Sequence, residues 1–165
     1  MRHVISVLVE NEFGVLSRIS GLFSGRGFNI ESLCVAETND PNISSMTIVT
    51  RGSDEIIEQI TKQLRKLITV VKVTDFTGTD FIDREMILIK VKATEGTRAE
   101  VLSIADIFRA KIVDVSLKSY TVELTGDESK IEAILDLFRP MGIIDLVRTG
   151  TVAISRSDKT KRTKK

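Results

Sequence analysis

Two asparagines and a glycine flank the first predicted helix of this chain, at spacings that suit a small charged ligand. Asn11 and Gly14 lie in the turn between an apolar strand and the helix, and Asn29 follows the helix near the start of the next strand. The N-terminal amides of a helix attract a carboxylate or phosphate, and a glycine beside them lets the ligand approach the backbone closely. An asparagine amide can accept from an ammonium group and donate to a carboxylate. Because a free amino acid carries both of these groups, the turn is a candidate amino-acid site.

The apolar residues near this turn could hold the side chain of such a ligand. Val15 and Leu16 open the helix, and Ile30 lies at the start of the following strand. A simpler interpretation also fits these residues, in which Asn11 caps the helix and Gly14 only eases the turn. The bare sequence pattern leaves both interpretations open.

The usual signs of a catalytic or metal centre are missing from the sequence. His3 is the only histidine and Cys34 the only cysteine, and nothing in their spacing brings them together as base and nucleophile. No HExxH motif or Cys/His cluster has the spacing of a zinc site. The run Gly25-Arg26-Gly27 ends a helix, whereas a dinucleotide-binding loop follows a strand and opens a helix. We therefore expect no catalytic residue and no metal ligand.

The first half of the chain has the periodicities of a β-α-β-β-α-β unit. Residues 3–9 are apolar and rich in β-branched side chains, which is typical of a strand. The helical spacing of apolar residues from Val15 to Phe23, followed by glycines, predicts a helix. The apolar parity then shifts near Glu31 and Ser32, which indicates a bulge in the next strand. The other expected elements are strands at 28–37, 43–51 and 70–76, and a helix that opens after Ser53 with an apolar stripe from Ile56 to Leu67.

The second half repeats this order of elements. Residues 52–60 (GSDEIIEQI) and 126–134 (GDESKIEAI) share a glycine, an acidic first turn and an Ile-Glu-x-Ile run at a constant offset. Thr97 and Glu100 have the spacing of a capping box at the start of a helix. The expected elements are strands at 86–93, 111–119, 120–126 and 143–148, with helices around 101–108 and 131–138.

The expected fold class is therefore α+β, with two consecutive ferredoxin-like βαββαβ units. The short polar link at 77–83, which contains Gly78, is the expected boundary between them. We assign residues 1–78 to the first domain, 79–156 to the second and 157–165 to a basic flexible tail.

Composition bears on the compartment and on the partners. The chain of 165 residues is 42% hydrophobic, and no apolar run approaches the roughly 20 residues of a membrane helix. The N-terminal segment is too short for a secretory signal, and a single cysteine can form no internal disulfide, so we expect a cytoplasmic protein without a membrane span. Six of the basic residues lie in the last 11 positions, which leaves the rest slightly acidic and without an electrostatic footprint for nucleic acid.

RNA-recognition domains share this order of elements and are the main competing class of binding module. Such domains stack bases on aromatic side chains of their central strands. The expected first and third strands, at 3–9 and 43–51, contain no aromatic residue. We therefore expect no binding of nucleic acid.

Long stretches of the sequence also resemble a known family. HVISVLVENEFGVLSRISGLFSGRGFNIESLCVAET, followed by SSMTIVTRG, closely resembles the small subunits of bacterial acetolactate synthase, also called acetohydroxyacid synthase. The resemblance continues through TDFIDREMILIKV and GIIDLVRTG to AISR. By this resemblance the first half is an ACT domain, a regulatory module that binds amino acids, and the second half is the α/β domain of these small subunits.

The resemblance implies a regulatory subunit that has no catalysis of its own. Members of the family bind a large catalytic subunit, which joins two pyruvates, or pyruvate and 2-oxobutyrate, into acetohydroxy acids. Thiamine diphosphate, Mg²⁺ and FAD are expected on that large subunit, and no cofactor is expected on this chain. The small subunit raises the activity and makes it sensitive to feedback by branched-chain amino acids, usually valine. A free-standing ACT-type amino-acid sensor that acts on another partner is the alternative, and the family-specific form of residues 84–155 disfavours it.

The resemblance further implies a homodimer with effector sites at the interface between two ACT domains. The backbone amides around Gly14–Leu16 would bind the carboxylate of the effector, and the asparagines would take its polar head and brace the interface. The matching positions are Asn11, Gly14, Val15 and Leu16 for one wall, with Asn29 and Ile30 of the other chain opposite.

Overall fold

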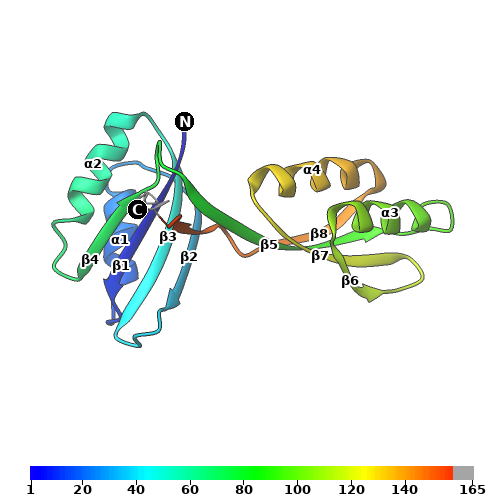
Figure 1. The fold of residues 1–165 in the computed structure, drawn as a ribbon, viewed down its shortest axis with the longest axis horizontal. Helices are drawn as coiled ribbons and strands as arrows, with labels where there is room; N and C mark the ends of the chain where they lie inside the picture. The colour runs from blue at the N-terminus through cyan, green and yellow to red at the C-terminus, as the bar shows by residue number, and fades with distance from the viewer. Residues whose placement is uncertain (158–165) are drawn as a thin grey trace, which may run out of the picture. The chain divides into compact units, whose positions relative to one another are not determined.

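The computed structural model describes residues 1–157, which separate into two compact units (Figure 1). One unit comprises Met1–Ile82 together with residues 153–157, and the other comprises Asp83–Val152. Each unit contains strands and helices in the order β-α-β-β-α-β. The predicted α+β class with two ferredoxin-like units is therefore confirmed.

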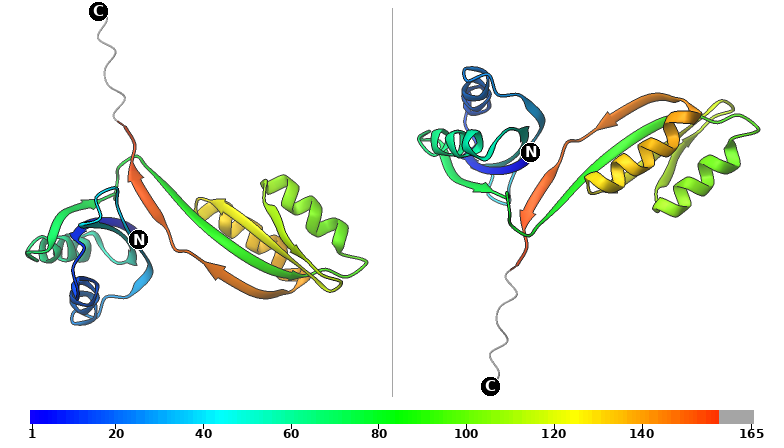
Figure 2. Two further views of the ribbon diagram at one scale, coloured as in Figure 1. Left: turned by 90° about the horizontal axis from the view of Figure 1, so that it is seen from below. Right: turned by 90° about the horizontal axis from the view of Figure 1, so that it is seen from above.

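The first unit is an antiparallel sheet with its helices packed on one face (Figure 2). Its elements are β1 (Arg2–Glu10), α1 (Val15–Ser24), β2 (Ile30–Glu37), β3 (Ile43–Arg51), α2 (Asp54–Leu64) and β4 (Val70–Asp75). The strands lie in the order β2-β3-β1-β4, so β2 forms one edge of this sheet and β4 the other.

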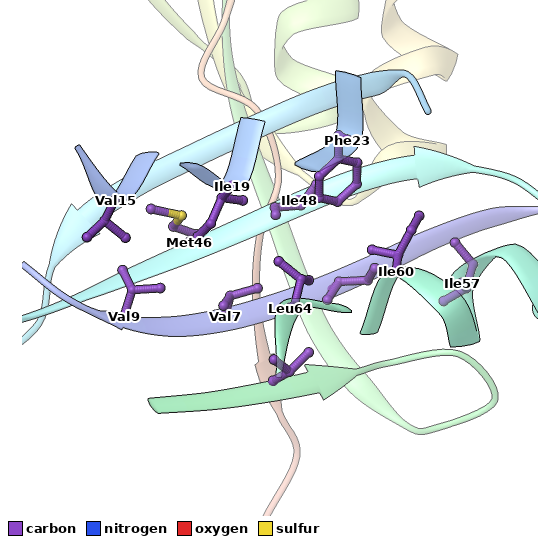
Figure 3. Close-up of a cluster of buried hydrophobic side chains, with 12 residues drawn as sticks. Val7, Val9, Val15, Ile19, Phe23, Met46, Ile48, Ile57, Ile60 and Leu64 are labelled. Atoms are coloured by element: carbon purple, nitrogen blue, oxygen red, sulfur yellow. The ribbon is translucent and has the colours of Figure 1, made fainter. Parts of the chain in front are cut away.

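Alternate residues of the strands and one stripe of each helix form the core of this unit (Figure 3). Ile5, Val7 and Val9 of β1 all face the helices, because successive side chains of a strand point to opposite faces. The helices contribute Val15, Ile19 and Phe23 from α1 and Ile57, Ile60 and Leu64 from α2. Since the buried stripe of α1 begins at its first residue, Val15, the turn before the helix is held close to the sheet.

Strand register decides which residues lie at which end of this sheet. Ile30, at the start of β2, pairs with Thr50, and Thr50 pairs with His3 at the start of β1. Glu10, the last residue of β1, lies at the opposite end. The predicted bulge in β2 is confirmed, since the register shifts between Ile30 and Ser32.

The second unit has the same architecture (Figures 1 and 2). Its elements are β5 (Phe81–Lys92), α3 (Arg98–Phe108), β6 (Lys111–Val115), β7 (Ser119–Gly126), α4 (Glu128–Phe138), the 3₁₀ helix η1 (Arg139–Met141) and β8 (Ile143–Arg148). The strands follow the order β6-β7-β5-β8. Ile87, Ile89 and Val91 of β5 face the helices, where they pack with apolar residues of α3 and α4.

A short strand that the sequence pattern did not predict returns the chain to the first unit. This strand, β9 (Val152–Ser155), pairs with β5. Ala153 packs against a small buried cluster of Val4, Val49, Phe76 and Phe81. The expected boundary lies after residue 78, whereas the structural division falls after Ile82, and these apolar contacts account for the return of Ala153.

Two further expectations concern the helices and the tail. Thr97 precedes α3, but it adopts helical backbone angles and its hydroxyl accepts from the N–H of Thr94 at 3.0 Å, so the predicted capping box with Glu100 is wrong. Of the expected basic tail, residues 158–165 lie outside the described residues. None of the helices described here is long and apolar enough to cross a membrane.

Candidate functional site

The turn between β1 and α1 is built around Gly14. This residue is the N-cap of α1 and has a left-handed backbone, with φ 84° and ψ −4°. Only glycine adopts such angles without steric cost, which explains the residue type at this position. A Cβ placed on Gly14 would meet no atom within 4 Å, so the space beside the turn is open. A ligand can therefore approach this backbone from outside.

The first turn of α1 also lacks a side-chain acceptor for its amides. No side chain of the described residues caps α1, and its first turn contains no acidic residue. By contrast, α4 has Asp127 at its N-cap, whose carboxylate accepts from the N–H of Lys130 at 2.9 Å. In α1 the N–H of Val15 reaches only the carbonyl of Glu12, at 3.4 Å. Open helical amides with a partial positive charge favour an external anion such as a carboxylate.

Asn11 holds the turn in place, and it does not cap the helix. Its side-chain nitrogen donates to Glu37 Oε1 at 3.1 Å and to the carbonyl of Pro41 at 3.0 Å, and its backbone N–H donates to the carbonyl of Asn42 at 2.7 Å. The interpretation that Asn11 is merely the cap of α1 is therefore wrong. Because these bonds occupy the amide hydrogens of Asn11, its Oδ1 is the atom that can serve an external donor.

The apolar residues of the turn differ in how far their side chains are exposed to solvent. The side chain of Val15 is only 2% exposed and belongs to the core, so Val15 can offer a ligand no more than its backbone. Leu16 is 45% exposed, and Ile30 is half-buried against the same core. Phe13, which no sequence pattern marks as a site residue, is fully exposed between Asn11 and Gly14.

The structure does not bring the two predicted walls together within one chain. Asn29 and Ile30 lie at the end of the sheet where β1 begins, while Asn11 follows the end of β1. The seven residue steps from His3 to Glu10 span about 23 Å at the rise of a β-strand. A free amino acid is far shorter than this separation. Asn11, Gly14 and Leu16 thus form one local group, and Asn29 and Ile30 form another.

A charged cluster around the buried Glu85 braces the second unit. Arg148 of β8 donates from Nε and Nη2 to the two carboxylate oxygens of Glu85 on β5, both at 2.8 Å, and from Nη1 to Glu132 at 3.2 Å. These hydrogen bonds, above all those to Glu85, raise the pKa of Arg148 above its ordinary value. Since Glu85 is only 6% exposed and both of its carboxylate oxygens accept from Arg148, the pair fastens β8 to β5.

His3 and Cys34, the residues that could carry nucleophilic or metal chemistry, lie within the fold of the first unit. The buried His3 ring contacts Thr77 Oγ1 at 2.7 Å and the carbonyl of Gly52 at 3.2 Å. Cys34 is a free, half-buried thiol on β2. Within residues 1–157 no group of three or more His, Cys, Asp or Glu side chains is placed to hold a metal ion.

Known proteins match the chain along nearly its whole length. Residues 5–72 match a family described as the AHAS small subunit-like ACT domain, and residues 84–157 match the family described as small subunit of acetolactate synthase. The probable acetolactate synthase small subunit of Archaeoglobus fulgidus is 51% identical over 159 residues, which cover 96% of this chain and 99% of that protein. The small subunit of acetolactate synthase isozyme 3 from Escherichia coli is 47% identical over 163 residues, 98% of this chain and 100% of the relative.

A solved structure agrees with these sequence matches. The crystal structure of the acetolactate synthase small subunit from Thermotoga maritima superposes with a TM-score of 0.85 at 40% identity, covering 96% of this chain and 99% of that one. The matches extend over both units, including the turn before α1. The chain therefore belongs to the family of acetolactate synthase small, regulatory subunits, and its first half is an ACT domain.

Proposed function

We propose that this chain activates a large acetolactate synthase subunit and makes it sensitive to feedback by a branched-chain amino acid, with valine as the effector. Membership of the family supports the pairing with a catalytic subunit. The observation that carries the effector site is the uncapped first turn of α1, open to solvent beside Gly14. The reaction itself, which joins two pyruvates into 2-acetolactate and CO₂, belongs to the large subunit, where thiamine diphosphate supplies the chemistry.

A second copy of the chain completes the effector site in this proposal. β2 is an edge strand, with Ile30 at its beginning and Glu37, the partner of Asn11, at its end. In an antiparallel pair of β2 strands, the beginning of one strand lies beside the end of the other. Such a pair would bring Asn29 and Ile30 of one copy next to the Asn11 turn of the second. Two-fold symmetry then generates two identical sites.

Each contributing group has a distinct role in binding the amino acid. The amides at Gly14–Leu16 bind its carboxylate, because they have no acceptor from a capping side chain. The Oδ1 of Asn11 accepts from its ammonium group, and the neighbouring Glu37 adds a negative charge on the same side. Asn29 of the second copy braces the polar head. Leu16 and Ile30 flank the aliphatic side chain.

Feedback follows from linkage between effector binding and the arrangement of the two copies. A ligand that binds two arrangements equally well shifts neither, so valine must bind the inhibited arrangement more tightly. A site shared between two chains responds directly to their relative orientation. Valine binding can therefore change the form in which the dimer engages the large subunit.

The proposal is tested with the complex of the small and large subunits, assayed for acetolactate formation with increasing valine. Gly14→Asp places a negative charge against the effector carboxylate, so we expect valine inhibition to disappear while activation of the large subunit persists. Gly14→Asn is the matched control, because asparagine and aspartate have the same size and both tolerate a left-handed backbone.

The comparison of these two variants isolates the charge from the backbone. We expect Gly14→Asn to keep part of the valine response and Gly14→Asp to lose it. A Gly14→Asp complex that valine inhibits as strongly as the wild type would show that the site lies elsewhere.

A further inference from the structure

Phe13 is the one aromatic residue of the chain whose side chain is fully exposed. All eight aromatic residues lie within residues 1–157, and the other seven are buried or half-buried. Phe23, Phe76 and Phe138 are at most 3% exposed and occupy the cores. Aromatic side chains are enriched at protein interfaces and in the lining of ligand pockets.

The backbone on either side of Phe13 is held by hydrogen bonds. Asn11 is bonded to Glu37, Pro41 and Asn42, and the N–H of Glu12 donates to the carbonyl of Glu10 at 2.9 Å. After Phe13, Gly14 caps α1, and Val15 is fixed in the core. The ring is therefore presented from a fixed turn.

Phe13 also lies beside the amides that bind the effector carboxylate in the proposed function. It directly precedes Gly14, where a Cβ would meet no atom within 4 Å. The side chain of Val15 is turned into the core and cannot reach a ligand there. Among the residues of this turn, only Phe13 and the half-exposed Leu16 can cover an aliphatic group that extends from the bound carboxylate.

We infer that Phe13 packs against the aliphatic side chain of the bound amino acid and determines which side-chain size the site prefers. This inference rests on the proposed function, because it concerns the same site. A ring contact senses the size of the ligand side chain and leaves the carboxylate and ammonium contacts unchanged. Loss of the ring should therefore weaken the binding of larger aliphatic amino acids more than that of smaller ones.

The experiment measures calorimetric binding of alanine, 2-aminobutyrate and valine to the full-length protein, which share one head group and differ by methyl or methylene groups. One such group in an apolar pocket is worth roughly 10–200-fold in discrimination. We expect Phe13→Ala to weaken the binding of valine by at least about tenfold and the binding of alanine by less than about twofold, so that most of the preference for valine is lost. Phe13→Leu should retain most of the selectivity. Leu117→Ala, which removes an exposed apolar side chain from the second unit, is the matched control and should change nothing.

The outcomes separate this inference from the proposed function. If Phe13→Ala lowers the affinities for the three amino acids equally, or leaves these affinities unchanged, the ring does not contact the effector side chain and the inference is overturned. An equal loss together with a raised dimer dissociation constant in sedimentation would assign Phe13 to the interface between copies. If the wild type binds none of the three amino acids, and valine does not inhibit the complex either, the proposed function itself fails.

Discussion

Asp127 and Gly14 are the N-cap residues of α4 and α1, but only Asp127 offers a side-chain acceptor to the first-turn amides of its helix. Asp127 supplies a carboxylate to the N–H of Lys130, which satisfies α4 from within the chain. Gly14 has no side chain to offer, and its positive φ keeps other residue types away from the position. The first turn of α4 is thus capped by a side chain of the chain itself, whereas the first turn of α1 has no side-chain cap.

The carboxylate of Asp127 should also make the stability of the fold depend on pH. The N–H of Lys130, and then the hydroxyl of Ser129, lower the pKa of Asp127 below its usual value. Because the folded pKa lies below the unfolded one, the carboxylate stabilises the fold above the unfolded pKa of about 3.9, and this stabilisation is lost as the pH falls through the folded pKa. Asp127 is largely exposed, so solvent screening keeps the effect small.

Replacement of Asp127 by asparagine isolates this charge while keeping a good N-cap. We expect Asp127→Asn to lower the free energy of unfolding by roughly 0.3–1 kcal/mol at pH 7, since it removes a negative charge from a helix N-terminus. Urea unfolding of both proteins at pH 7 and pH 2.5 measures the difference. The difference should shrink at the lower pH, and a pH-independent difference would contradict this role of the charge.

Among the elements, α1 and β2 carry the two groups of residues that the proposed effector site requires. α1 begins where its buried stripe begins, at Val15, which fixes the open amides at one end of the sheet. β2 carries Ile30 at the other end, paired with Thr50. A separation of about 23 Å along the strands prevents one copy from bringing both groups of residues to one amino acid. Edge position and direction make β2 the element through which a second copy can supply the missing half.

Much of this arrangement was predictable from sequence, because it depends on local periodicity. The apolar stripe of α1, the bulge in β2 and the open turn at Gly14 all follow from residue types at short spacing. The burial of Val15 follows from the same stripe, which already assigns this side chain to the core. Its side chain therefore cannot line the predicted site, and only its backbone amide stays a candidate for ligand binding.

The remaining features depend on contacts between distant segments, which periodicity cannot reveal. The bond from Asn11 to Glu37 joins residues 26 positions apart. The packing of Ala153 on the first unit joins opposite ends of the chain. Strand register, which separates Asn29 from Asn11, is likewise set by the pairing of whole strands.

The brace between β5 and β8 gives a prediction about stability. Arg148→Met would leave the Glu85 carboxylate, only 6% exposed, without its partner, and we expect a loss of roughly 3 kcal/mol in the free energy of unfolding. The double variant Glu85→Leu/Arg148→Met removes both charges and should recover most of that loss. Lys62→Met, which breaks the exposed pair with Glu58 on α2, is the control and should have little effect.

Thermal or urea unfolding of these variants measures the coupling between the two charges. A double variant as unstable as Arg148→Met alone would mean that the cost arises from lost packing, and the brace would then have no electrostatic basis.

At the scale of the whole molecule, the central claim is that each effector site is made by two copies of the chain. Every proposed site takes Asn11 and Gly14 from one copy and Asn29 from the second. Two chains that carry different substitutions, one in each half of the site, can therefore form one intact site when they pair with each other. A site made by a single chain could not be restored in this way.

The most direct test mixes full-length Gly14→Asp and Asn29→Ala chains, after dissociation and reassembly, and measures valine binding by calorimetry. Neither variant alone should bind valine, because each spoils both sites of its own dimer. In a mixed dimer one site contains both defects and the other contains none, so random pairing should restore about a quarter of the wild-type sites at wild-type affinity. A reassembled mixture that binds no more valine than the separate variants would contradict a site shared between two copies.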